Sequence, residues 1–189
     1  MGASDKATEG VSAARRVHRD LMRRGCFNTT LIGLFVAAVA GCTTFGDTFR
    51  VTAFLREQIT GDTWRACLAR EYQTQTRTIV RESRDWAAAS RFSGKGWAAL
   101  SNGDVAPWSA SAFDPSAERQ ARFDTARGEL ETALTGKALA PCACARAQAT
   151  YDGWIAAAAS GRPGANEEAA GGEYSDALAA CRQAQAKAR

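Results

Sequence analysis

The side chains best suited to do chemistry in this chain are its cysteines. The sequence has six cysteines and a single histidine, His18. Four of the cysteines (Cys67, Cys142, Cys144 and Cys181) lie in the later part of the chain, an even number that allows three complete pairings. Only Cys142 and Cys144 are clustered and no histidine accompanies them, so the pattern argues against a metal site. We expect at least one disulfide among the four, with buried free thiols as the alternative.

The lack of histidine after position 18 also bears on catalysis. It removes the usual general base and both the Ser–His and the Cys–His nucleophile pairs from the rest of the chain. The acidic pairs Glu129/Glu131 and Glu167/Glu168 are typical of solvated helix faces, because nothing apolar surrounds them that could shift a pKa. No phosphate- or dinucleotide-binding motif occurs. We therefore expect a protein that is not an enzyme, with no catalytic residues and no cofactor.

Cys42 stands apart from the other cysteines because it ends a short apolar run over residues 31–41, preceded by Arg23-Arg24. A basic stretch, a short apolar core and small residues form a secretory signal, and the run is too short to span a bilayer. Val39-Ala40-Gly41-Cys42 resembles the lipobox of bacterial lipoproteins. That resemblance implies cleavage before Cys42 and acylation of the cysteine by chains such as palmitate. We expect a signal peptide over 1–41 and a lipid anchor in the bilayer at Cys42.

Two details refine this leader. Residues 1–21 lack apolar periodicity, so either translation starts at Met22 or the basic region is unusually long. Thr43 follows the cysteine in place of the Asp that often signals inner-membrane retention, which favours the periplasmic face of the outer membrane. Cysteine pairing is favoured in such an oxidising compartment.

The charge of the chain is concentrated in the leader. Six of the 24 Lys and Arg residues and three of the 20 acidic residues precede Cys42, so the remainder carries 18 basic and 17 acidic residues, a net charge of +1. A nucleic-acid-binding surface requires a clustered positive excess. We expect no nucleic-acid partner.

The elements that would position these residues are helices. Alanine is abundant after residue 60 and no run alternates with period two, which predicts an all-α bundle of about five helices. We expect a tether over 42–61, part of which packs on the domain or forms a short helix, and a helical domain over 62–189. The expected helices, with Asp62 and Asp114 as N-caps of the first and third, cover about Thr63–Ser83, Ala87–Ser101, Pro115–Thr135, Pro141–Ser160 and Glu173–Lys187. Residues 161–172 are expected to be a flexible connector.

Apolar periodicity predicts a core built mainly from aromatic residues and leucine. Trp108 is outside any helical stripe, in a loop beside Pro107. It is therefore the candidate centre of a partner-binding patch of aromatic and arginine residues, or alternatively a lid over the core. The expected core residues are Trp64, Leu68, Tyr72, Trp86, Phe92, Leu130, Leu134, Tyr151, Trp154 and Leu178.

Several segments, taken in order, resemble the helical amino-terminal region of proteobacterial lipoproteins that are similar to outer-membrane protein A (OmpA). The resemblance covers roughly residues 60–183. It implies residence in the cell envelope and a helical module, but no known activity. The matching pieces are Leu68-Ala69-Arg70-Glu71-Tyr72, Asp85-Trp86, Ala89, Phe92, Lys95-Gly96, Ala126-Arg127, Leu130, Ala133-Leu134, Ala147-Gln148, Tyr151-Asp152, Trp154 and Cys181-Arg182.

The chain departs from that family in two ways. Its members continue into a peptidoglycan-binding domain that the residues up to Arg189 do not contain, so wall binding is not carried over. In those proteins a cysteine follows the Tyr-Asp pair, whereas Gly153 occupies that place here. If Gly153 lay beside Cys181 in an antiparallel helix pair, Cys142 and Cys144 would be more than a helical turn from Cys181. Cys67 would then be the more suitable partner for one of them.

These observations favour a lipid-anchored, non-catalytic module that binds another component of the envelope. The alternative is a peptidoglycan-associated lipoprotein, in which exposed arginines contact wall carboxylates. The arginines considered for that contact are Arg65, Arg77, Arg81 and Arg84.

Overall fold

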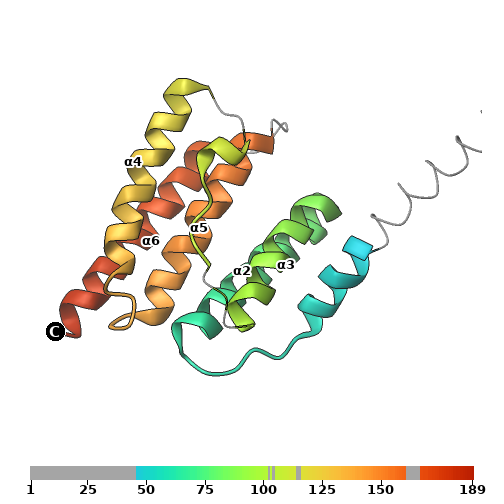
Figure 1. Cartoon of the computed structure of the whole chain (residues 1–189), viewed down its shortest axis with the longest axis horizontal. Coiled ribbons are helices and arrows are strands. Elements are labelled where there is room, and N and C mark those ends of the chain that lie inside the picture. The colour runs from blue at the N-terminus through green and yellow to red at the C-terminus, as the bar shows by residue number, and fades with distance from the viewer. Residues whose placement is uncertain (1–45, 102, 104, 114–115, 161–166) are drawn as a thin grey trace, which may run out of the picture. The chain divides into compact units, whose positions relative to one another are not determined.

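The computed structural model describes residues 46–101, 103, 105–113, 116–160 and 167–189. Within these residues the chain forms helices and connecting turns without any strand, which confirms the expected all-α fold. Residues 46–56 are helical and precede the labelled elements of Figure 1. Those elements are α2 (Trp64–Glu82), α3 (Trp86–Leu100), the 3-10 helix η1 (Ala110–Phe113), α4 (Ala117–Leu134), α5 (Pro141–Ser160) and α6 (Glu167–Lys187).

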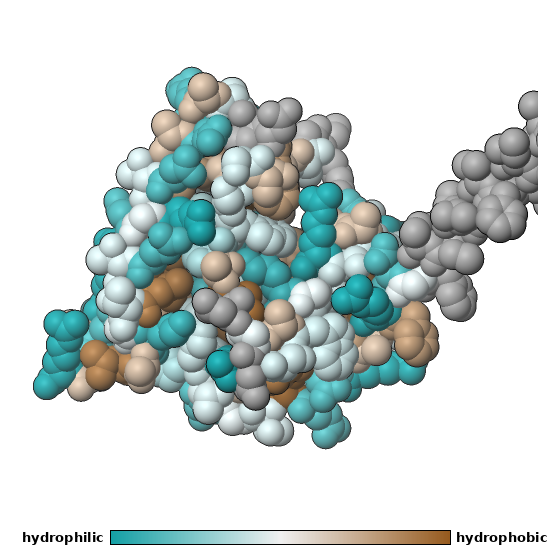
Figure 2. All heavy atoms as spheres, viewed as in Figure 1, coloured by the Kyte–Doolittle hydropathy of each residue, from teal (hydrophilic) through white to brown (hydrophobic). Residues whose placement is uncertain are grey.

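Helix α5 is the centre of the bundle that residues 47–189 form. It packs against α6 on one side and against α2 on the other, while α3 packs on α2 and α4 lies along the α5–α6 pair (Figure 1). Figure 2 shows hydrophilic residues over much of the surface on this face, with hydrophobic residues in small separate patches. Among the described residues, none of the helices is both long and apolar enough to cross a membrane.

Two hydrophobic clusters lie on opposite faces of α5. The first, here called the aromatic cluster, is formed mainly by α4, α5 and α6 and contains Phe123, Tyr151, Trp154 and Tyr174. The second, here called the α2–α3 cluster, joins Phe54, Leu68, Tyr72 and Phe92 to small alanines of α5. Because α5 contributes to both clusters, it couples the two halves of the domain.

Local capping explains where most helices begin. The side chain of Thr63, not of Asp62, accepts a hydrogen bond from the Ala66 N–H, so the expected N-cap of α2 was wrong by one residue. Ser116 caps α4, which begins at Ala117, later than expected. The proposed capping residue Asp114 and its neighbour Pro115 lie outside the described residues. Helix α5 has the expected bounds, in keeping with proline at its first position.

The structure extends the helical domain at two places where connectors were expected. Residues 46–56 form a helix, as the alternative for the tether allowed, and they bury Val51 and Phe54 completely. Helix α6 begins at Glu167, so residues 167–172 of the expected connector are helical. A Cβ on Gly171 would lie 3.1 Å from Trp154, so the absence of a side chain there lets α6 approach the ring. Packing thus outweighs the low helix propensity of glycine.

Most of the expected core is buried. Leu68, Tyr72, Phe92, Leu130, Tyr151, Trp154 and Leu178 are all buried. Trp64, Trp86 and Leu134 are only half-buried. Phe49 and Leu139 are the large hydrophobic residues that remain exposed in the described part of the chain.

Candidate functional site

A fully buried carboxylate, that of Asp152 in α5, is the centre of a polar cluster between the helices. One of its oxygens accepts hydrogen bonds from the Tyr72 hydroxyl and the Lys95 ammonium group, each at 2.5 Å. The other oxygen accepts a hydrogen bond from the backbone N–H of Trp108 at 2.8 Å. Three donors therefore compensate the carboxylate for its loss of water.

The same cluster fixes the loop that follows α3. Lys95 donates a second hydrogen bond to the backbone carbonyl of Ala106 at 2.8 Å. Gln148, also buried on α5, donates to the carbonyl of Val105 at 2.6 Å and to the Tyr72 hydroxyl at 3.3 Å. Side chains from two helices, Lys95 of α3 and Gln148 of α5, thus bond to the loop just before Trp108. These hydrogen bonds hold the loop, and with it the indole ring of Trp108, in a fixed position.

Burial controls the protonation equilibria of this cluster. It raises the pKa of the Asp152 carboxyl, against the opposing effect of the Lys95 ammonium group. It lowers the pKa of Lys95, although the carboxylate again acts in the opposite direction. Burial, followed by the negative charge of Asp152, raises the pKa of Tyr72 well above its usual value. Because Asp152 is fully covered by its partners, we assign the cluster a role in positioning Trp108 rather than direct contact with a ligand.

Trp108 is half-buried and packs between two phenylalanines. Its ring centroid lies 4.8 Å from that of Phe92 and 5.2 Å from that of Phe113, and Lys95 Nζ is 4.9 Å from the indole centroid. The contact with Phe92 matches the expectation of a lid over the core. The residue is not covered completely, so a role in partner contact stays a prediction.

The exposed part of Trp108 lines a surface hollow with a cavity volume of about 170 Å³. The Arg91 guanidinium lies 5.6 Å from the centroid of Phe113, so a cation lies beside the aromatic wall. An adjoining hollow of about 260 Å³, lined by α2, α3 and α5, shares Ala88, Phe92, Ala156 and Ser160 with it. The lining of the first hollow, here called the Trp108 hollow, consists of Asp85, Ala87, Ala88, Arg91, Phe92, Trp108, Phe113, Ala156, Ala159 and Ser160.

The four candidate cysteines form two disulfides, and each disulfide has one of its cysteines near the N-terminus of α5. Cys142 pairs with Cys67 of α2, and Cys144 pairs with Cys181 of α6. Residues two apart on a helix point in directions about 200° apart, so each reaches a different neighbour. The expected link from Cys67 to one of these two cysteines is confirmed.

The expectation that Cys181 lies beyond the reach of Cys144 is wrong. The Cα atoms of Cys144 and Cys181 are 4.6 Å apart. Helices α5 and α6 do pair antiparallel, but Trp154 lies against Gly171, so the segment beside Gly153 is near the start of α6 and not at Cys181. The register taken from the resemblance therefore does not apply to this helix pair.

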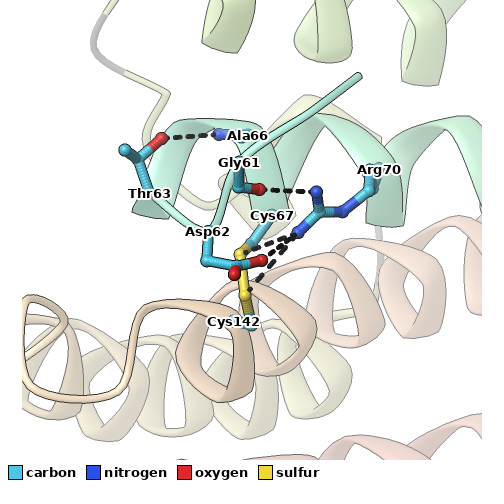
Figure 3. Close-up of a disulfide and its surroundings, with 7 residues drawn as sticks. All are labelled: Gly61, Asp62, Thr63, Ala66, Cys67, Arg70 and Cys142. Carbon is cyan, nitrogen blue, oxygen red and sulfur yellow. Dashed lines mark hydrogen bonds and ion pairs between the residues drawn. A yellow bond between two sulfur atoms is a disulfide. The ribbon is translucent and has the colours of Figure 1, made fainter. Parts of the chain in front are cut away.

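Figure 3 shows the surroundings of the Cys67–Cys142 disulfide. Arg70 Nη2 lies 3.3 Å from Cys67 Sγ and 3.8 Å from Cys142 Sγ, and it forms an ion pair with Asp62 at 3.2 Å. Asp62 and the two sulfurs are close enough to suggest a metal site. The two cysteines are bonded to each other, however, so of these three residues only Asp62 offers a free metal-ligating group.

The remaining candidate residues are spread over the chain. Cys42, the expected lipid-bearing residue, lies outside the described residues. The arginines considered for wall contact are exposed and extend from one end of α2 to the turn after it. Arg81 forms an ion pair with Glu82, and Arg77 bonds with Gln73.

Sequence reasoning missed the pairing of Lys95 with Asp152. A signal for it was present, because Asp152 lies on the same face of α5 as Ala149 and Ala156, which pack in the α2–α3 cluster. A carboxylate on a buried face requires a partner. Its partner lies 57 residues away in sequence, so local pattern could not identify it.

No family model, no curated protein and no solved structure matches this chain. The resemblance to OmpA-like lipoproteins accordingly stays a prediction.

Proposed function

We propose that this protein is a lipid-anchored, non-catalytic module of the outer membrane that binds another envelope protein through the Trp108 hollow. The hollow is the observation that carries the binding part of the proposal. It combines tryptophan and arginine, which are enriched in protein–protein hot spots, with phenylalanine, which is enriched in interfaces. A hydrophobic side chain of a partner is the ligand that suits an aromatic recess of about 170 Å³.

Pre-organisation supports this use of the hollow. The Trp108 backbone is bonded to Asp152, and its ring packs against Phe92, so little conformational freedom remains to be lost on binding. A ligand that also carries a carboxylate would find Arg91 at the rim. Binding therefore needs neither a reactive side chain nor a cofactor.

The proposed anchor would hold the hollow near the membrane. Only residues 43–46 separate Cys42 from the unit that begins at Asp47, a span of at most about 18 Å. Stable membrane attachment needs more than one acyl chain, because each buried CH₂ contributes only about 0.8 kcal/mol. Confinement to one surface raises the effective concentration of a membrane-proximal partner.

The first test measures the anchor and the partner together. The full chain is produced with its own leader, and its amino-terminal peptide is analysed by mass spectrometry. We expect acylated Cys42, and an unmodified Cys42 would contradict the anchor. Proteins that co-purify with it after cross-linking in membranes are then compared with those recovered with Trp108→Ala and Arg91→Glu.

Arg81→Glu is the matched control, because Arg81 is also an exposed helix arginine but does not line the hollow. We expect the cross-linked partner to be lost with the two hollow variants and kept with the control, while circular dichroism shows intact helices in all three. A partner kept by both hollow variants would contradict the proposal. Binding to isolated peptidoglycan that only Arg81→Glu abolishes would favour the wall-associated alternative.

A further inference from the structure

The two disulfides differ in their access to solvent. Cys144 and Cys181 are both 0% exposed, and their sulfurs lie under Gln185. Cys67 is buried at 2% exposure, but its partner Cys142 is exposed. Thiol–disulfide exchange requires a thiolate to reach a sulfur atom. An attacking thiol can therefore approach Cys142 without unfolding the domain.

Two positive groups favour a thiolate at the exposed disulfide. Arg70 contacts both sulfurs and is nearer to that of Cys67 (Figure 3). Cys142 is the second residue of the 20-residue helix α5, where the helix dipole also favours negative charge. Asp62 opposes them, but its carboxylate is paired with the same guanidinium. A cation and a helix N-terminus are the environment in which cysteine thiolates are stabilised.

We propose that the Cys67–Cys142 disulfide is a site of thiol–disulfide exchange with a dithiol reductant, and that Cys144–Cys181 is a structural disulfide. The site is defined by an exposed sulfur, a buried leaving sulfur and a guanidinium in contact with both. This inference does not depend on the Trp108 hollow.

The exchange consists of two substitutions at sulfur. A thiolate of the dithiol attacks Cys142 Sγ and forms a mixed disulfide, while the Cys67–Cys142 bond breaks and its electron pair stays on Cys67 Sγ beside Arg70. The second thiolate of the reductant then attacks its own first sulfur and releases Cys142 as a thiolate. The reductant becomes a disulfide, the two cysteines gain two electrons, and the two protons lost by the dithiol are available to both cysteines.

The first experiment follows the wild-type protein. Folded full-length protein is treated with dithiothreitol, quenched with iodoacetamide at intervals and digested for mass spectrometry. We expect Cys67 and Cys142 to be alkylated at least about tenfold faster than Cys144 and Cys181, since a buried disulfide must be exposed before it is attacked. Equal rates, or faster labelling of Cys144 and Cys181, would overturn the proposal.

The second experiment tests the role of Arg70. Arg70→Gln is expected to slow reduction of Cys67–Cys142 by about threefold to tenfold, because the leaving thiolate loses its cation. Arg70→Lys should restore part of the rate. Arg77→Gln, two turns further along α2, is the control and should leave the rate unchanged. An unchanged rate in Arg70→Gln would show that the guanidinium has no such role.

Arg70 also donates a hydrogen bond to the carbonyl of Gly61, so its replacement changes the local structure as well as the charge. A third variant separates these two effects. Asp62→Asn removes the opposing carboxylate and keeps the arginine. It should accelerate reduction, and a slower rate would contradict the electrostatic argument.

Discussion

The two sides of α5 are held together by different physical means. On the α6 side, Trp154 stacks on Tyr174 with centroids 5.5 Å apart, packs edge-on against Phe123 at 4.7 Å, and is accompanied by a fully buried disulfide. On the α2 side, small alanines, a buried ion pair and a solvent-accessible disulfide make the contact. The α6 side therefore depends mainly on packing of large aromatic rings, whereas the α2 side also contains a buried ion pair in which each charge requires the other.

The largest effect is expected from Trp154→Ala in the aromatic cluster. The residue is 7% exposed and contacts three aromatic rings, so its removal should cost about 3–5 kcal/mol in the free energy of unfolding. Urea denaturation followed by circular dichroism measures this cost. An unchanged midpoint would mean that the aromatic cluster does not stabilise this side of α5.

Breaking the buried ion pair should have the next largest effect. Lys95→Met leaves the Asp152 carboxylate buried without its cation, with an expected cost of about 3 kcal/mol at neutral pH. The double variant Lys95→Met/Asp152→Asn removes both charges and should recover part of that loss. A double variant less stable than Lys95→Met would contradict this account.

The pH dependence of Lys95→Met sharpens the same test. Burial already raises the pKa of Asp152 above its unfolded value, and loss of Lys95 removes a group that opposes the increase. The folded state then holds its proton to higher pH than the unfolded state, so stability falls as pH rises from about 4 through the raised pKa. We expect Lys95→Met to be less destabilised at pH 5 than at pH 8. The double variant lacks the carboxyl group and should not show this difference.

The smallest of these effects concerns the contact of α3 with the helix over residues 46–56. A Cβ on Gly96 would lie 2.0 Å from Phe54 Cζ, and the fully buried ring has little room to move. Gly96→Ala should therefore destabilise the domain by about 1–3 kcal/mol. Gly94→Ala, two residues earlier in the same helix, meets nothing within 4 Å and should stabilise it by about 0.5–1 kcal/mol. Thermal unfolding of both variants checks the opposite signs, and equal shifts would refute the close contact.

The helical class and most helix positions could be predicted from sequence because they depend on local chemistry. Pro141 marks the start of α5, and alanine-rich composition favours helix throughout. The low helix propensity of glycine predicts a connector around Gly171, but residues 167–172 are helical. Gly171 is needed there because α6 approaches Trp154, a contact that only the tertiary structure brings about. The sequence allows a short helix before residue 61, but it does not specify that Phe54 is buried.

The candidate site was predictable only in part. Trp108 is predictable as a candidate because it lies outside every helical stripe, and the structure places it both against the core and in the lining of a hollow. The hydrogen bonds of Asp152 and Lys95 that hold its loop in place are not predictable from local pattern, because these residues are far apart in sequence. The prediction for Cys181 was wrong for a different reason, because it used a helix register taken from the resemblance to OmpA-like lipoproteins.

The spacing of Cys142 and Cys144 has a topological consequence. Disulfides at 67–142 and 144–181 close two consecutive covalent rings that are joined only through Ala143. A protease that cuts once inside either ring leaves the chain in one piece until the disulfide of that ring is reduced. Under reduction of the accessible disulfide alone, a nick between Cys67 and Cys142 would separate fragments, whereas a nick between Cys144 and Cys181 would not. A single cut in the backbone of either ring therefore releases no fragment as long as both disulfides are intact.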